Sequence, residues 1–454
     1  MKFFVKQPKL AVVGLIGVGL AVMGIVLISL NSRVKIAKVP KNLTRSVQFT
    51  GRNLLVASDA DMVATAYADG KLDQVEGIED ALTVVTLPLN KNKPNVLQIE
   101  ASNSVMNWPQ TVIASPDGTK AYIIETRGQV PNDTQEFDDI WSDMPPGKLL
   151  TIVDISNPSK LTVLKKVAIA SSPNSVSISP DGKFIAIDNK EKGRELIIVE
   201  LENGLPKERR YFTIENNSSE VGIIRAISWH PSGRFLALNL GDTEIAFYEF
   251  KADGSIEPFG DRIKIGTRLS EGKFTPDGRY FVVTDTGWGE GTLGAIFNRN
   301  GKLFSIGFDR NNGEHKLVST AEVGLSPEGF AMSPDGSLLV TVNMRRTYAP
   351  EGILKLIVPS TEYSSLSLVK IDLKSGELTT VGEEYGFEGL LPEDAVFDAD
   401  GKSVAVVIYN YREKSPKKGA IEFWNVIGGD QPKLERTGFK IDVTRGAHSM
   451  YLVK

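Results

Sequence analysis

The distribution of apolar and polar residues repeats six times along the chain. Each time, a short apolar run ends in a four-residue turn related to Ser-Pro-Asp-Gly, and a second apolar run follows. In such a turn proline presets φ, aspartate hydrogen-bonds to nearby backbone and glycine adopts the left-handed conformation, so each copy predicts a β-hairpin. The turns are Ser115-Pro116-Asp117-Gly118, Ser179-Pro180-Asp181-Gly182, His230-Pro231-Ser232-Gly233, Thr275-Pro276-Asp277-Gly278, Ser333-Pro334-Asp335-Gly336 and Asp398-Ala399-Asp400-Gly401.

The apolar runs after the turns, such as 184–187 and 280–283, are nearly continuous, which is typical of strands buried on both faces. A third run and a more polar fourth run predict four-stranded blades. The chain ends supply one more unit, because 447–453 resembles the first strand of a repeat and 50–57 resembles the turn and second strand. We therefore expect an all-β, seven-bladed β-propeller closed by its N- and C-terminal strands, with six or eight blades as the alternatives.

The repeated pattern Pro-x-x-φ-x-φ-Ser-Pro-Asp-Gly, in which φ is an apolar residue, resembles the repeats of YVTN-type and lactonase-like β-propellers. The resemblance covers most of the chain after about residue 48. It implies the propeller fold, but it leaves the function open. The family includes sugar lactonases, quinoprotein-like and haem-binding relatives and extracytoplasmic binding proteins, and one fold supports many activities.

The N-terminal residues differ from the rest of the chain. Residues 1–9 form a basic leader, and the uncharged stretch 10–30 is long enough, at about 30 Å as a helix, to cross a bilayer. We expect 10–30 to be a transmembrane signal anchor, 31–47 a linker and 48–454 the propeller; a cleaved signal peptide is the alternative. The basic leader favours an inner (plasma) membrane protein with its propeller on the periplasmic, extracytoplasmic side.

Composition excludes several classes of chemistry. The net charge of −4 and the scattered basic residues give no electrostatic footprint for nucleic acid. The chain has no cysteine, which excludes disulfides, thiolate nucleophiles and iron–sulfur clusters. Its three histidines, His230, His315 and His448, are too few for a multi-histidine copper centre. We therefore expect no metal site and no cofactor.

Polar residues recur five positions before the first residue of each turn, where the inner strand of a blade reaches the mouth of the central channel. We call these seven residues the ring: Gln110, Asn174, Arg225, Ser270, Glu328, Glu393 and, in the closing blade, His448. Glu271 and Asp394 add neighbouring carboxylates. A converging set of this kind predicts a ligand or catalytic site, with His448 or a glutamate as general base and Arg225 holding an anion. The alternative is a water-filled mouth whose charges pair across the axis.

The resemblance to lactonase-like propellers also bears on this ring. Lactonases of that family are thought to use histidine, glutamate and arginine near the channel mouth. It therefore implies a catalytic role for His448, Glu328, Glu393 and Arg225.

Loops on the same face supply further candidates. Arg127 and Arg345 begin two of the longest loops and are candidates for binding an acidic ligand, with solvated loop charges as the alternative. Trp288 is a candidate for stacking on a sugar or cofactor, with a purely packing role as the alternative. The insert 128–147 predicts a short amphipathic helix, capped by Asp133 or Thr134, that presents Phe137 and Trp141. We expect its apolar face to pack on its own propeller; a lid or a partner-docking element is the alternative.

Together these features predict a membrane-anchored, extracytoplasmic binding module for a small polar ligand or an envelope protein. A lactonase-like hydrolase acting through the ring is the alternative. A third possibility is a scaffold that uses the acidic insert within an envelope complex.

Overall fold

The computed structural model describes residues 34–43, 46–63, 66–90, 92–106, 108–131, 133–214, 224–289, 298–348, 363–410 and 417–454. Within these ranges no helix is long and apolar enough to cross a membrane. The predicted anchor at 10–30 lies outside the described residues.

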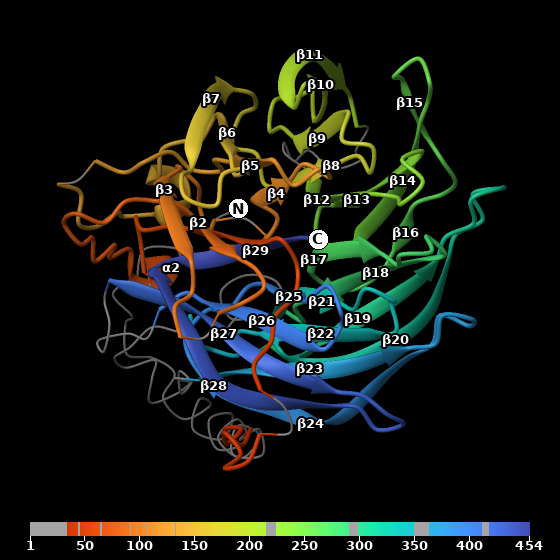
Figure 1. Cartoon of the computed structure of the whole chain (residues 1–454). Coiled ribbons are helices and arrows are strands. Elements are labelled where there is room, and N and C mark those ends of the chain that lie inside the picture. Colours follow the sequence, from red (N-terminus) through yellow and green to blue (C-terminus); the bar gives the residue numbers. More distant parts are fainter. Residues whose placement is uncertain are drawn as a thin grey trace, which may run out of the picture.

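The described strands form seven antiparallel sheets arranged around a central axis, and Figure 1 looks along that axis. From its inner to its outer strand, the first sheet contains β4 (Val112–Ala114), β5 (Lys120–Ile124), β6 (Leu149–Asp154) and β7 (Thr162–Ala168), and the second contains β8 (Val176–Ile178), β9 (Phe184–Asp188), β10 (Leu196–Glu202) and β11 (Leu205–Phe212). The third sheet contains, in the same order, β12 (Ile224–Trp229), β13 (Phe235–Leu240), β14 (Glu244–Phe250) and β15 (Ile256–Pro258), and β16 (Ile263–Lys264) also pairs with β14. The next three are β17 (Leu269–Phe274), β18 (Tyr280–Asp285), β19 (Asn300–Gly307) and β20 (Lys316–Leu325); β21 (Pro327–Met332), β22 (Leu338–Asn343), β23 (Tyr363–Ile371) and β24 (Leu378–Glu388); and β25 (Ala395–Phe397), β26 (Ser403–Ile408), β27 (Lys418–Ile427) and β28 (Lys433–Thr444).

The seventh sheet joins the two ends of the propeller. Its inner strand β29 (Ala447–Val453) comes from the C-terminal end, and β1 (Asn53–Ser58), β2 (Ala81–Thr86) and β3 (Val96–Glu100) come from the N-terminal end. β29 pairs with β1 so that Tyr451 lies opposite Leu55. This pairing covers the edges of two strands that would otherwise be exposed. The predicted seven-bladed propeller and its closure are therefore confirmed.

The repeated turns have the predicted geometry. In the first, the N–H of Gly118 donates to the carbonyl oxygen of Ser115 at 2.8 Å, and Gly118 has a φ of 66°. The Ser115 hydroxyl donates to Asp117 at 2.5 Å, and Asp117 accepts the N–H of Thr119. These local bonds fix the hairpin between β4 and β5. In each blade the corresponding turn fixes the position at which the inner strand ends.

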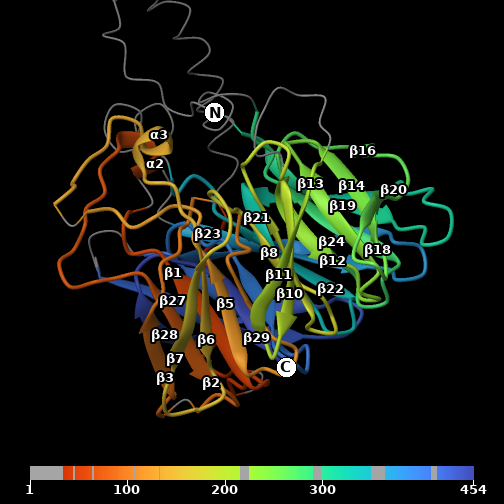
Figure 2. The ribbon, with the colours of Figure 1, turned by 90° about the horizontal axis from the view of Figure 1, so that it is seen from above.

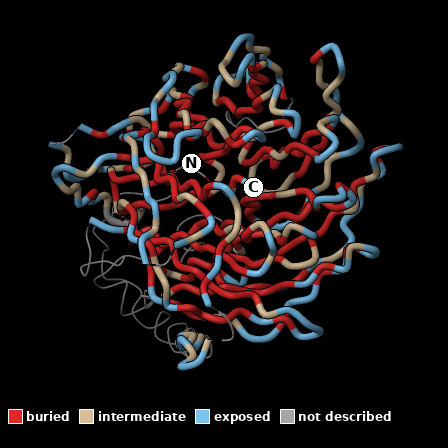
Figure 3. Tube along the Cα trace, in the orientation of Figure 1, coloured by how far each residue is buried: buried red, intermediate tan, exposed pale blue. Residues whose placement is uncertain are grey.

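The core lies between neighbouring blades. One cluster, for example, packs Ile123 and Val153 of the β4 blade against Leu55 and Leu82 of the closing blade. Figure 3 shows that the buried residues follow the inner and middle strands, whereas exposed residues concentrate at the periphery. This distribution explains the continuous apolar runs in the sequence, because both faces of a middle strand pack against a neighbouring blade.

Two short helices lie on one face of the propeller, and the C-terminus lies at the other (Figure 2). They are α2 (Ala66–Asp69) and α3 (Ile140–Asp143). The predicted helix in the insert is therefore only four residues long, and its N-cap is Asp139, not Asp133 or Thr134. The segment before it is extended because its backbone pairs with the α2 segment, where the N–H of Leu72 donates to Gln135 at 2.9 Å.

Candidate functional site

The ring lies where the inner strands stop pairing regularly. The pairing shifts register between Ile224 and Ala226 in β12, between Leu269 and Gly272 in β17, and between Pro327 and Phe330 in β21. These three irregularities contain Arg225, Ser270 and Glu328. Bulges of this kind redirect side chains and are frequent beside functional sites. In the β4, β8 and β25 blades, the ring residue comes before the first paired residue.

A left-handed residue lies two positions before the ring residue in four blades. These are Ser172 with a φ of 45°, Ser326 with 56°, Leu391 with 45° and Gly446 with 85°. Left-handed backbone is uncommon for residues other than glycine and is strained for a bulky leucine. The fold therefore holds the backbone in the same left-handed conformation two residues before each of four ring residues: Asn174, Glu328, Glu393 and His448.

Glu328 and Glu393 are adjacent ring residues whose carboxyl groups are buried without satisfied hydrogen bonds. The two residues are only 5% and 2% exposed, and the Oε2 atom of each has no hydrogen-bond partner. A Cβ atom at Gly329 would lie 2.3 Å from the carbonyl oxygen of Glu393, so glycine allows the two strands to approach closely. Burial raises the pKa of Glu328 to about 8, and burial followed by repulsion from Glu328 raises the pKa of Glu393 well above its usual value.

His448 lies beside this pair in a defined tautomer. The amide nitrogen of Asn103 donates to the carbonyl oxygens of Ser58 and Ala101, so its Oδ1 must accept the 2.7 Å hydrogen bond from Nε2 of His448. Burial lowers the pKa of His448 to about 3, which keeps its imidazole neutral. Nδ1 therefore carries the lone pair, 4.0 Å from Oε2 of Glu393 and 3.5 Å from the Thr111 hydroxyl.

The opposite side of the ring is cationic. Arg225 and Arg268 each contact one oxygen of Asp242 at 3.2 Å, so two guanidinium groups share one carboxylate. Burial, and then the charges of Arg127 and Arg225, lower the pKa of Lys190 to about 8. The four candidate catalytic residues thus divide into two groups: Glu328, Glu393 and His448 follow one another around the ring, whereas Arg225 lies across the channel.

A belt of hydrogen bonds between neighbouring inner strands lies directly below the ring, and several predicted ligand-binding residues take part in it. Oε1 of Gln110 accepts from the hydroxyl of Ser175 at 2.6 Å. Glu271 accepts the N–H of Phe330 at 3.2 Å, and Asp394 accepts that of Met450 at 2.8 Å. These carboxylates therefore connect adjacent blades. Ser270 also crosses between blades, because its hydroxyl donates to the carbonyl oxygen of Glu328 at 2.6 Å.

The remaining predicted ligand-binding residues are distributed around the ring. Asn174 donates to Asp188 at 2.9 Å and to the carbonyl oxygen of Ile224 at 3.3 Å. Trp288 donates to the hydroxyl of Ser326 at 3.0 Å. Arg345 is only 2% exposed and pairs with Glu384 at 3.1 Å, so its charge is directed away from the ring carboxyls.

An apolar cap covers the ring side of the propeller. Its members come from loops of several blades and from both helices: Met62, Ala66, Leu72, Val105, Met106, Val130, Ile140, Met144, Met344, Tyr348, Leu390, Leu391 and Tyr409, with Val63, Tyr67, Phe137, Trp141 and Trp288 packed against them. The expectation that the insert packs on its own propeller is confirmed. The aromatic ring centroids of Trp141 and Tyr67 are 5.4 Å apart, and Arg127 donates to the carbonyl oxygen of Trp141 at 2.8 Å.

Several residues of this region were not found by sequence reasoning. Tyr67 lies in α2, and Asn103 and Tyr409 lie in loops; none of them occupies a repeated position, so no pattern marked them. Asp59, Asp61 and Asp80 each place one carboxylate oxygen within 4.8 Å of the others. Both oxygens of Asp59 and of Asp80 accept backbone N–H groups, including those of Val105 and Ala60, so these carboxylates also hold the loops together.

Comparison with known proteins shows likeness at the level of the fold. No protein-family model and no curated protein sequence matches the chain. Among solved structures, a proposed 6-phosphogluconolactonase of Bacteroides fragilis is 15% identical, with a TM-score of 0.58 over 91% of this chain and 100% of that one. The periplasmic gluconolactonase PpgL of Pseudomonas aeruginosa is also 15% identical, with a TM-score of 0.58 over 90% and 99%. A hypothetical selenium-binding protein of Sulfolobus tokodaii is 12% identical, with a TM-score of 0.57 over 90% and 94%. The chain therefore has a lactonase-like, seven-bladed propeller fold.

Proposed function

We propose that this protein is an extracytoplasmic propeller that binds a small polar ligand at the ring. One observation carries the proposal: the carboxyl groups of Glu328 and Glu393 are buried side by side, and the Oε2 atom of each lacks a hydrogen-bond partner. An unsatisfied buried polar group costs about 1–3 kcal/mol, so a protein rarely retains two of them together without a function.

The protonation of this pair indicates what it would bind. Because burial raises the pKa of Glu328 to about 8, its carboxyl group is largely protonated near neutral pH and can donate a hydrogen bond. The Nε atoms of Arg127 and Arg225 are also buried donors without a partner. The available groups are therefore mostly donors, which suits a ligand rich in carbonyl, carboxylate or hydroxyl oxygens.

Calorimetric titration with gluconate and glucono-1,5-lactone tests this proposal. We expect binding by the wild-type protein, retention of binding in Glu328→Gln, which keeps a donor, and loss of binding in Glu328→Met. Glu377→Met, which changes an exposed residue, is the matched control. Equal affinities of Glu328→Met and wild type for a ligand that binds would contradict a role of the ring.

Lactone hydrolysis is the second candidate, favoured by the lone pair on Nδ1 of His448, which lies near the carboxyl pair and is held only by a 3.5 Å hydrogen bond with the Thr111 hydroxyl. In this reaction Nδ1 takes a proton from water, the water oxygen attacks the lactone carbonyl, and the C–O bond that closes the lactone breaks. Glu328 gives its proton to the departing alkoxide and regains one from the imidazolium through water. Because burial lowers the pKa of His448 to about 3, this residue is a weak base, and we place hydrolysis second to binding.

A rate measurement separates the two candidates. Hydrolysis of glucono-1,5-lactone should exceed the buffer rate and should fall in both Glu328→Gln and His448→Gln if the protein is a lactonase. Glu328→Gln distinguishes the functions, because an amide can support binding but cannot transfer the proton. If the rate with wild-type protein equals the buffer rate, the protein is not a lactonase for this substrate, and binding is the candidate function that remains.

We also propose that residues 10–30 anchor the propeller in the inner membrane, since this uncharged stretch follows a basic leader. Protease treatment of intact spheroplasts should digest the propeller, and carbonate washing should leave the chain in the membrane fraction. Protection of the propeller would place it in the cytoplasm. Release by carbonate would indicate a cleaved signal or a peripheral association.

The envelope-protein partner is a separate proposal, based on Phe137 and Trp141. Both are only partly buried in the cap, so each retains some exposed surface. Cross-linking in intact cells, comparing wild type with Phe137→Ser, should show the loss of a specific product. An unchanged set of products would argue against a docking role.

A further inference from the structure

The central channel also has a cavity at the end opposite the ring. Its volume is about 400 Å³, and it is bordered by the turn prolines Pro180, Pro231 and Pro334, so it opens on the face that carries the repeated turns. All seven inner strands contribute to its wall. Gln110 and Glu271, which take part in the hydrogen-bond belt, lie at its inner end, so the cavity reaches the ring only at Gln110.

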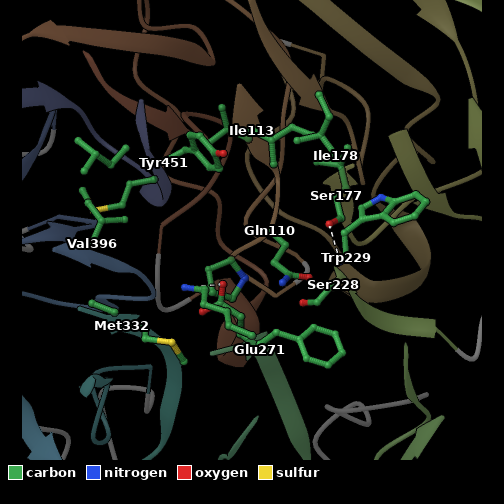
Figure 4. Close-up of a pocket in the computed structure, with 18 of the residues that line it drawn as sticks. Gln110, Ile113, Ser177, Ile178, Ser228, Trp229, Glu271, Met332, Val396 and Tyr451 are labelled. Carbon is green, nitrogen blue, oxygen red and sulfur yellow. Dashed lines mark hydrogen bonds and ion pairs between the residues drawn. The ribbon is translucent and has the colours of Figure 1, made fainter. Parts of the chain in front are cut away.

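The wall of this cavity has an apolar half and a polar half. The position two residues before each turn, with its equivalent in β29, faces the channel. Around the axis these residues are Ile113, Ser177, Ser228, Lys273, Ala331, Val396 and Tyr451. The polar members come from the three consecutive strands β8, β12 and β17. The members from β21, β25, β29 and β4 are mainly apolar, although Tyr451 of β29 also carries a phenol hydroxyl. Figure 4 shows Val396 and Tyr451 across the cavity from Ser177 and Ser228, with Ile113 on the wall between Tyr451 and Ser177.

The polar half presents a positive charge to the cavity. The side chain of Lys273 is 31% exposed, whereas that of its partner Glu271 is 3% exposed. The ammonium group donates to Glu271 at 2.9 Å and to the carbonyl oxygen of Phe330 at 2.6 Å, which leaves one of its three N–H bonds. Glu271 also accepts the N–H of Phe330, so the carboxylate is directed into the belt. Glu271 also borders the inner end of the cavity, but the ammonium group of Lys273 is the more exposed of the two charges.

The two serines of the polar half differ in what they can offer. The hydroxyl of Ser228 donates to the carbonyl oxygen of Gly272, so its hydrogen is used. The hydroxyl oxygen of Ser177 accepts the N–H of Trp229 at 3.3 Å and keeps its own hydrogen to donate. The polar half thus offers a cationic donor at Lys273 and a neutral donor at Ser177.

We propose that this cavity binds a small amphipathic carboxylate. The carboxylate would accept from Lys273 and Ser177, and the apolar body would pack on Ile113, Val396 and Tyr451. The volume lies within the range of about 300–1,000 Å³ that is typical of small-molecule sites. A purely water-filled channel would gain nothing from an apolar half, because apolar side chains are stabilised only when water is removed from them.

Calorimetric titration of the full-length protein with hexanoate and with hexanamide, its neutral analogue, tests the inference against a protein-free blank. We expect hexanoate to bind at least about tenfold more tightly than hexanamide, because a charge-assisted hydrogen bond is stronger than a neutral one. Lys273→Gln should remove this difference. Lys316→Gln, at an exposed position on β20, is the matched control and should not change it.

A second variant covers the possibility that Lys273→Gln does not fold. Val396→Asp places a negative charge in the apolar half and should weaken both probes. Glu328→Met should leave hexanoate binding unchanged, so failure of this inference is distinguishable from failure of the proposed ring function. The inference is overturned if hexanoate does not bind, if both probes bind equally, or if hexanoate binding is unchanged in Val396→Asp.

Discussion

The buried carboxyl group of Glu328 predicts a specific dependence of stability on pH. Its pKa is about 8 in the folded protein and 4.5 for an exposed glutamate. Between these values the folded protein holds a proton that the unfolded chain has released, so the free energy of unfolding falls as pH rises. Since one pKa unit corresponds to about 1.4 kcal/mol, the full loss between about pH 4.5 and pH 8 is on the order of 5 kcal/mol.

Glu328→Gln removes this dependence, because the amide has the same shape and no proton to lose. Urea unfolding followed by tryptophan fluorescence should show that the stability of the variant relative to wild type increases by about 3 kcal/mol between about pH 5.5 and pH 8. Glu377→Gln, at an exposed turn position, should show no such increase. If the difference between Glu328→Gln and wild type is the same at both pH values, Glu328 is ionised in the folded protein and the reasoning about the ring is wrong.

Three further predictions concern the closure and the cap. Gly446→Ala should lower the urea midpoint far more than Gly77→Ala, because both glycines have positive φ but only a Cβ at Gly446 would meet the carbonyl oxygen of Asp59, at 1.5 Å. Truncation after Gly446 removes β29 and exposes an edge of β1, so size-exclusion chromatography should show aggregation in place of a monodisperse propeller. Trp141→Ala should cost about 1–3 kcal/mol, as the loss of a partly buried aromatic ring, and should speed hydrogen exchange of the 66–72 backbone, which pairs with the insert.

The repeated part of the fold could be predicted because its determinants are local and occur many times. The Ser115–Gly118 turn closes through bonds within six residues, and five similar turns follow. Counting from the turns also located the ring, since each ring residue lies the same five positions before its turn, whatever the length of the paired strand. The strand pairing of Leu55 with Tyr451 was predictable for the same reason: each chain end lacked what the other supplied.

The state of the ring could not be predicted, because it depends on contacts that have no fixed spacing. Asn103 fixes the tautomer of His448 from a loop 345 residues away in sequence. Arg225 pairs with Asp242, on the loop of its own blade, and this pairing keeps it from the glutamates. The insert looked helical because its apolar residues have helical spacing, yet Gln135 pairs with Leu72 and only Ile140–Asp143 forms a helix.

The two candidate sites lie at opposite ends of the same seven inner strands, and they differ in how regular the strand pairing is at each end. At the turn end, regular pairing continues to the last residue, so side chains two positions before the turn form a smooth wall around Lys273 and Val396. At the ring end, pairing breaks at bulges, and Glu328 is buried without a partner. In the belt between them, Gln110 accepts from the hydroxyl of Ser175 and Asp394 accepts the N–H of Met450, so the two sites are joined by hydrogen bonds between neighbouring inner strands. Gln110 belongs to the ring and also lines the cavity, so the two candidate sites have this residue in common.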